Sequence, residues 1–99
     1  MKRDFAPFHP GEILSGEFFG PMGLSQCQLA KSIGVPALRI SQIVRGKRAV
    51  TADTALRLSK YFGLNDRYWL RLQARFDEQV AKQALARELA RIAPHAASA

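Results

Sequence analysis

Residues 26–45 constrain the fold more than any other segment of the chain. Two short runs of apolar residues at helical spacing are separated by a brief turn that includes Gly34. Glycine readily takes the left-handed conformation that ends a helix and redirects the chain. Two helices joined by such a turn form a helix-turn-helix. We therefore predict a first helix over residues 26–33 and a second from near Pro36 to Arg45, with the second entering the major groove of DNA.

The outward face of the second helix follows from its rotation of about 100° per residue. If Ile40, Ile43 and Val44 face the core, the opposite side of the helix is available to bases. The candidate base-reading residues on and beside that face are Ala37, Leu38, Arg39, Ser41 and Gln42. Arg pairs with guanine, Gln with adenine, and Ser with either base. The exposed Leu38 either contacts a thymine methyl group or is an incidental surface residue.

Candidate phosphate ligands surround that face. The start of the first helix presents free backbone N–H groups and the positive end of the helix dipole. Basic residues that follow the second helix are either a solvated loop or, beside a helix of this type, a contact to the DNA backbone. The predicted phosphate-binding residues are Ser25, Gln26, Arg45, Lys47 and Arg48. The net charge of +7, from fifteen Lys and Arg against eight Asp and Glu, favours nucleic acid or an acidic partner.

The rest of the chain predicts three more helices, so we expect an all-α bundle of five helices in one domain. The first helix begins at Pro10, and Gly20, Pro21 and Gly23 are expected to end it near residue 19. Thr51 is expected to cap the fourth helix, with Leu56 among its inward residues. No segment alternates apolar and polar residues for long enough to indicate a strand.

The fifth helix opens at Asn65 or Asp66 and extends to about residue 92. One of its faces forms a predicted core stripe of Trp69, Phe76 and Val80. A second apolar stripe, about 140° around the helix, consists of Leu85, Leu89 and Ile92. The core of one monomer cannot easily bury both faces. The second stripe is therefore predicted to be a protein interface, the alternative being a helix end that folds back onto its own domain.

These patterns divide the chain into three parts. We expect an N-terminal arm over residues 1–9, a helix-turn-helix domain over 10–80 and a C-terminal helical extension over 81–99. In the arm, Phe5, Pro7 and Phe8 are available to fold back onto the core.

Other classes of function find little support. The single cysteine, Cys27, excludes an intramolecular disulfide, and with no apolar run of about 18 residues and no signal segment a cytoplasmic location is expected. His9, His95 and Cys27 do not have the spacing of a metal site. We expect no metal, no cofactor, no membrane contact and no catalytic residues, hence no enzyme. His9 is instead expected to order the start of the first helix.

Four segments together resemble HigA-type antitoxins, which belong to the Xre-like, lambda-repressor-like helix-turn-helix repressors. They are His9–Leu14, Val35–Arg48, Thr51–Gly63 and the stretch from Trp69 to Asp77, so the resemblance covers roughly residues 8–80. It implies a homodimer that binds its own operator DNA and represses the shared operon. It also implies binding and inhibition of a small RelE-like ribonuclease toxin, and the predicted interface in the extension would then meet either the twin subunit or that toxin. The alternative is a stand-alone transcriptional regulator.

The resemblance carries the base-reading role over to the residues already chosen from helical geometry. The chain departs from the family pattern at Leu38 and Arg45, where a polar residue such as asparagine is expected. The residues usual in the family at these positions therefore do not predict the operator sequence of this chain.

Overall fold

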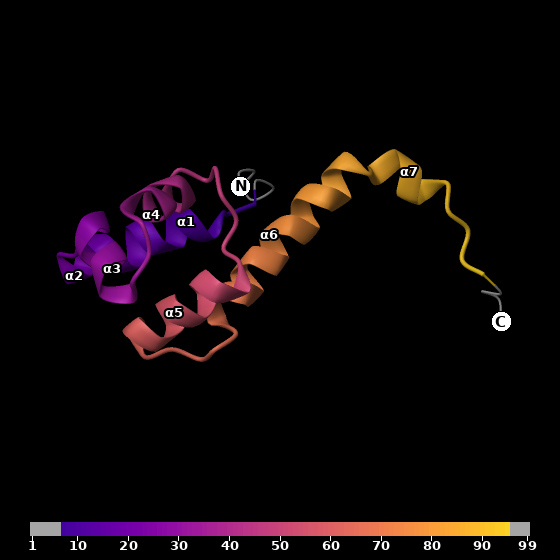
Figure 1. Cartoon of the computed structure of the whole chain (residues 1–99). Coiled ribbons are helices and arrows are strands. Elements are labelled where there is room, and N and C mark those ends of the chain that lie inside the picture. The colour runs from indigo at the N-terminus through magenta and orange to yellow at the C-terminus, as the bar shows by residue number, and fades with distance from the viewer. Residues whose placement is uncertain (1–6, 96–99) are drawn as a thin grey trace.

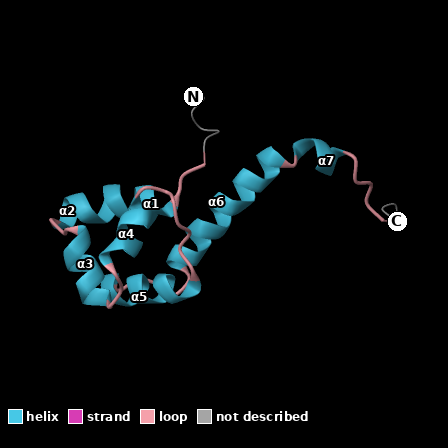
Figure 2. Ribbon diagram, turned by 45° about the horizontal axis from the view of Figure 1, so that its top comes forward, coloured by secondary structure: helices cyan, strands magenta, loops and turns pink. Residues whose placement is uncertain are grey.

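The computed structural model of the chain describes residues 7–95, which are helical with short connections and contain no strand (Figure 2). Its helical segments are α1 (Pro10–Ile13), η2 (Leu14–Phe19), α2 (Gly20–Met22), α3 (Gln26–Ile33), α4 (Ala37–Val44), α5 (Ala52–Phe62), α6 (Tyr68–Ala84) and α7 (Ala86–Ala90). The segments up to the start of α6 form a bundle, and α6 then leads away from it to α7 (Figure 1). The predicted all-α helix-turn-helix bundle is confirmed for the residues described.

The first helix is longer than its sequence suggests. Because α1, η2 and α2 follow one another without a break, the chain stays helical from Pro10 to Met22. The helix ends at Gly23, which takes the left-handed conformation as one of the predicted stops, and the prediction that Gly20 and Pro21 end it near residue 19 is wrong. The middle segment is a π-helix, whose N–H groups bond five residues back, as the Gly20 N–H does with the carbonyl of Ser15. This change of register lets Pro21 stand in the first turn of a new α-helical segment, where its missing N–H is tolerated.

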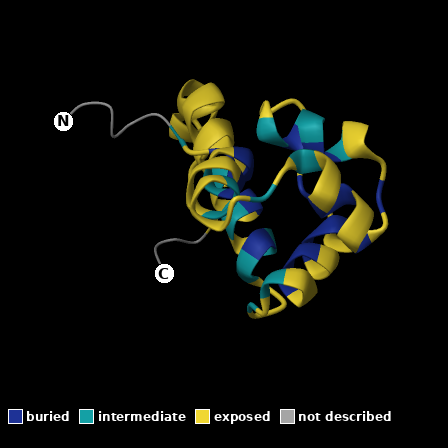
Figure 3. Cartoon of the chain, turned by 90° about the vertical axis from the view of Figure 1, so that its left-hand side faces the viewer, coloured by how far each residue is buried: buried dark blue, intermediate teal, exposed yellow. Residues whose placement is uncertain are grey.

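The core lies where α3, α4, α5 and the first turns of α6 face one another, and Figure 3 shows the buried residues on their inner sides. Ala30 of α3 is buried, and its small side chain allows α3 and α4 to approach closely. The indole of Trp69 is fully buried and contacts the rings of Phe18, Phe62 and Tyr68. The buried apolar residues are Leu14, Leu29, Ala30, Ile33, Val35, Ile40, Ile43, Val50, Ala55, Leu58 and Trp69.

Two predicted core positions are wrong. Leu56 is 48% exposed and lines a shallow hollow between α3 and α5, and Val80 is 42% exposed because α6 has already left the bundle there. Helical periodicity identifies the face on which a residue lies, but it does not say how far the neighbouring helix extends along that face. Phe76, half-buried, is the last residue of that stripe with partial cover.

The start of α1 is fixed by His9 and Gly11. His9 is buried, its Nδ1 accepts the Gly11 N–H at 2.9 Å, and its ring meets Phe76 edge-on at 4.9 Å. Burial lowers the pKa of the His9 imidazole below its ordinary value, an effect that Glu12, the Arg48 backbone and Asp77 oppose. A neutral ring can keep Nδ1 as an acceptor, so the predicted role of His9 in ordering the first helix is confirmed.

Gly11 lies directly against the backbone of α4. A Cβ atom at this position would overlap the carbonyl oxygen of Ile43 and press on the Cα of Val44. Glycine is therefore required here by close approach of two helices rather than by backbone conformation. In the arm, Phe5 lies outside the described residues, Pro7 is half-buried and Phe8 is 60% exposed, so the expectation that Phe8 folds onto the core is wrong.

Local chemistry at the ends of α5 and α6 differs slightly from expectation. Thr51 occupies the N-cap position of α5 as predicted, but its side chain makes no capping hydrogen bond. Asn65 opens the way into α6 by accepting the Arg67 N–H at 2.8 Å, while Arg67 itself is the residue before the helix.

The C-terminal helix is broken where a single helix to Ile92 was expected. Leu85 leaves the helical conformation between α6 and α7, and every residue from Asp77 to His95 is exposed. In Figure 3 the ribbon of this extension is coloured as exposed. The predicted second stripe accordingly lies open on a projecting arm, with Leu85, Leu89 and Ile92 all exposed. Within residues 7–95, no helix combines the length and the apolar character needed to cross a bilayer.

Candidate nucleic-acid interface

Helix α3 is fixed by hydrogen bonds at both of its ends, and those at its C-terminus also hold the turn to α4. Ser25 Oγ accepts the Gln28 N–H at 3.1 Å while Gln28 Oε1 accepts the Ser25 N–H at 3.0 Å, a capping box that starts the helix as its sequence suggests. Gly34 ends the helix in the left-handed conformation, with φ of 73°. From α5, Arg57 Nη1 donates to the carbonyls of Ile33 at 2.7 Å and Gly34 at 3.3 Å. These bonds satisfy carbonyls at the end of α3 and set the angle at which α4 leaves.

Helix α4 is held by its inner side, which leaves its outer side open. Ile40 and Ile43 are fully buried and Val44 is half-buried. On the opposite side Leu38 is 64% exposed. Of the remaining residues of the predicted face, Ala37 is exposed, whereas the half-buried ones are Arg39, Ser41 and Gln42. The geometric arrangement is the one that a groove-reading helix requires, although its base-reading role stays a prediction.

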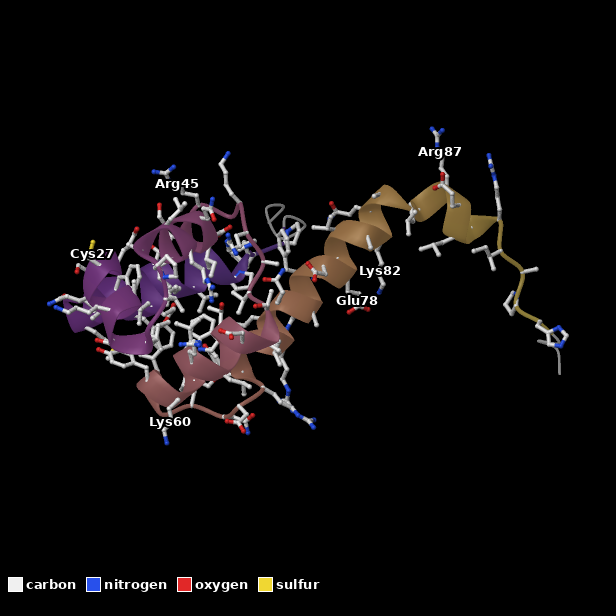
Figure 4. All side chains as sticks on the ribbon, viewed as in Figure 1. Cys27, Arg45, Lys60, Glu78, Lys82 and Arg87 are labelled. Carbon is white, nitrogen blue, oxygen red and sulfur yellow. The ribbon has the colours of Figure 1, made fainter. Side chains whose placement is uncertain are left out.

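Basic side chains follow α4 directly. Arg45, Lys47 and Arg48 are exposed, and Figure 4 shows Arg45 pointing away from the bundle on the side opposite to Lys60. At the other end of the motif, Ser25 is exposed and Gln26 is half-buried. The Ser25 hydroxyl accepts a bond within the cap, so its own proton is still available for a phosphate oxygen. All the predicted phosphate ligands thus lie at the two ends of the helix-turn-helix, with the outer side of α4 between them.

Comparison with known proteins places this fold in a family. A helix-turn-helix family model matches residues 20–69. Virulence-associated protein I of Dichelobacter nodosus is 49% identical over 82 residues, which cover 83% of this chain and 76% of that protein. The Pseudomonas aeruginosa antitoxin HigA, solved with the higBA promoter, is 36% identical with a TM-score of 0.85, and the match covers 89% of this chain and 97% of that chain. An addiction module antidote protein of the HigA family from Coxiella burnetii is 40% identical with a TM-score of 0.84, covering 89% and 97%.

The chain belongs to the HigA-type antitoxins of the Xre-like helix-turn-helix family. The resemblance drawn from the four sequence segments is thereby confirmed. This is a family of DNA-binding regulators and antitoxins, and none of the three names above denotes an enzyme.

In this HigA-type chain, two of the predicted base-reading residues are held by other side chains. Arg39 Nη1 donates to Asp53 Oδ1 and to Thr54 Oγ1, each at 3.4 Å. Arg48 Nε donates to Gln42 Oε1 at 2.8 Å. Asp53 and Thr54 belong to α5 and were not among the predicted site residues, because Asp53 lies 14 positions from Arg39 and no sequence pattern links the two.

A further residue outside the predicted site supports the basic segment. Gln73 of α6 is buried, and its Oε1 accepts the Val50 N–H at 2.8 Å while its Nε2 donates to Asp77 at 2.9 Å. The chain after Arg48 is therefore anchored to α6 two residues later. Helical periodicity places Gln73 on the buried face of α6, four residues after Trp69, but it does not identify the Val50 N–H, 23 positions away, as its partner.

Proposed function

We propose that this chain is the antitoxin of a type II toxin–antitoxin pair, binding its operator as a homodimer and repressing its own operon. The observation that supports this is the open outer side of α4, bounded by basic residues after the helix and by the N-terminus of α3. A structural neighbour with the same fold was solved with promoter DNA, which supports the same use of this surface. Two copies related by a two-fold axis would place their α4 helices in successive major grooves about 34 Å apart. The operator is then expected to be nearly palindromic.

The second part of the proposal is neutralisation of a RelE-like ribonuclease toxin by direct binding. Its support is the family and the projecting α6–α7 extension, where Leu85, Leu89 and Ile92 are exposed. Apolar side chains grouped on an arm outside the bundle are typical of a surface that a protein partner covers. We propose that either the twin subunit or the toxin covers them.

Removing a base-reading side chain should weaken specific binding. Arg39→Ala or Gln42→Ala should each reduce operator affinity by about 1–3 kcal/mol and relax the preference for one base pair, because each removes hydrogen bonds to a base edge. Fluorescence anisotropy against the operator and a scrambled duplex measures both quantities. Lys60→Ala is the control, since Lys60 points away from the α4 side of the bundle (Figure 4). Equal loss for operator and scrambled DNA would contradict the assignment of these residues to base reading.

Charging the apolar stripe should separate the two possible occupants. Leu85→Glu with Leu89→Glu buries two carboxylates in any interface that covers the stripe, so that complex should weaken strongly. Light scattering reports the dimer, and co-purification with the product of the adjacent gene reports the toxin complex. Ala86→Glu with Ala90→Glu adds the same charge to the same exposed helix away from the stripe. A variant that stays dimeric and still captures the toxin would show that the stripe is not an interface.

A further inference from the structure

Asp53 lies at the centre of a small network that joins the helix-turn-helix turn to the reading side of α4. Its Oδ1 accepts from Arg57 Nε at 2.7 Å and from Arg39 Nη1 at 3.4 Å. Arg57 is in turn bonded to the carbonyls of Ile33 and Gly34 at the end of α3. The position of the Asp53 carboxylate is therefore set by the same residue that fixes the turn.

Arg39 is bonded to α5 through a single nitrogen of its guanidinium group, Nη1. Both bonds, to Asp53 Oδ1 and to Thr54 Oγ1, use Nη1. Thr54 is 2% exposed, so its hydroxyl is a fixed acceptor rather than a mobile surface group. The guanidinium is planar, and the edge formed by Nε and Nη2 lies away from Nη1. That edge carries two parallel donors, the pattern that matches the N7 and O6 acceptors of guanine in the major groove.

We propose that Asp53 and Thr54 are positioning residues that present the Nε–Nη2 edge of Arg39 to a guanine, and so determine base specificity without touching DNA. A free arginine side chain samples many rotamers and loses that freedom when it binds a base. An arginine whose Nη1 is already bonded loses less rotamer freedom on binding, and its remaining donors point in one fixed direction. The inference rests on the proposed operator binding.

The charges in this network affect the orientation of the Arg39 side chain more than the stability of the fold. Side chains of Asp53 and Arg39 are 58% and 30% exposed, and ion pairs with this much solvent contact contribute little to folding. The alternative is that the Asp53 carboxylate competes with DNA for Arg39 and so weakens the contact between Arg39 and a base. In that case, removing the carboxylate would strengthen operator binding, whereas a positioning role requires that discrimination be lost.

The test compares base discrimination rather than affinity alone. Operator duplexes in which each G·C pair is exchanged in turn are titrated by anisotropy with the full chain and with Arg39→Ala. The pair at which Arg39→Ala abolishes discrimination, a loss of roughly 5- to 150-fold, is the one that Arg39 reads. Asp53→Asn should lose about tenfold of the discrimination at that same pair and little elsewhere. Combined with Arg39→Ala it should cause no further loss, since both act on one contact.

Two further variants keep the result interpretable. Asp66→Asn makes the same change in net charge at an exposed residue between α5 and α6, and it should leave discrimination intact. Thr54→Val removes the second bond to Arg39 without altering charge, and it should lose discrimination at the same pair as Asp53→Asn. Circular dichroism melting of each variant establishes that it is folded at the assay temperature.

The outcomes distinguish this inference from the proposed function. If the wild-type chain binds no duplex specifically, operator binding itself is wrong. If wild-type binding is specific and Arg39 reads a base, but both Asp53→Asn and Thr54→Val discriminate as well as wild type or bind more tightly, the positioning role is overturned. The same holds if wild-type binding is specific but Arg39→Ala leaves discrimination unchanged at every G·C pair that is exchanged.

Discussion

Replacing Gly11 with alanine should destabilise the protein by roughly 3 kcal/mol and reduce the fraction of chain able to bind DNA. The added methyl group would overlap the carbonyl oxygen of Ile43 and crowd the Cα of Val44. Both atoms belong to helix backbone, so no side-chain rotation can relieve the overlap, and α1 and α4 must move apart. Because α4 carries the predicted base-reading residues, such a shift also misplaces the reading side relative to the turn.

Gly16→Ala is the matched control for this substitution. Gly16 lies in the same continuous helical run, and a Cβ atom there would meet nothing within 4 Å. Alanine favours the helix over glycine by about 1 kcal/mol, so this variant should melt at the wild-type temperature or above it. Urea unfolding followed by circular dichroism gives the two free energies. Equal stability of the two variants would mean that α1 and α4 are not packed as closely as described.

The contact at Gly11 also marks the limit of what the sequence could predict. Local signals were sufficient for the elements themselves: apolar residues at helical spacing indicated α3 and α4, and Gly34 indicated the end of α3. They were also sufficient for the buried side of α4, since Ile40 and Ile43 recur at helical spacing. Each of these features depends on residues within one or two helical turns of one another.

Features that depend on an unusual helical register or on packing between distant residues were missed or wrong. The sequence shows Pro21 as a helix breaker, because the register change in the preceding π-helix is not visible as a pattern. Val80 continues the stripe of Trp69, but whether it is buried depends on where the bundle ends. The hydrogen bond from Arg39 to Asp53 requires α5 to lie beside α4, and that depends on how the helices pack. The candidate reading side was therefore predictable, and its supporting contacts were not.

Replacing Arg45 and Lys47 together with alanine should weaken all DNA binding, with the largest effect at low salt. Each phosphate contact contributes about 0.9 to the slope of log affinity against log salt, so losing two should reduce the slope by about two. If the difference vanishes near 1 M salt, affinity falls roughly thirtyfold at 0.15 M and roughly two-hundredfold at 0.05 M. Arg48 is left in place because its bond to Gln42 would confound base reading with phosphate binding.

A control variant that removes the same charge elsewhere distinguishes direct contacts between Arg45 or Lys47 and phosphates from a long-range attraction between the whole protein and DNA. Lys60→Ala with Lys82→Ala takes two positive charges from side chains that point away from the α4 side of the molecule (Figure 4). Anisotropy titrations of operator and scrambled duplexes over a salt series should show the reduced slope only for the Arg45 and Lys47 variant, and equally for both duplexes. Long-range attraction, which salt screens within about 10 Å at 0.1 M, would lower the slope similarly in both variants. Matching slopes in the two variants would therefore remove the segment after α4 from the DNA interface and leave only the outer side of α4 itself.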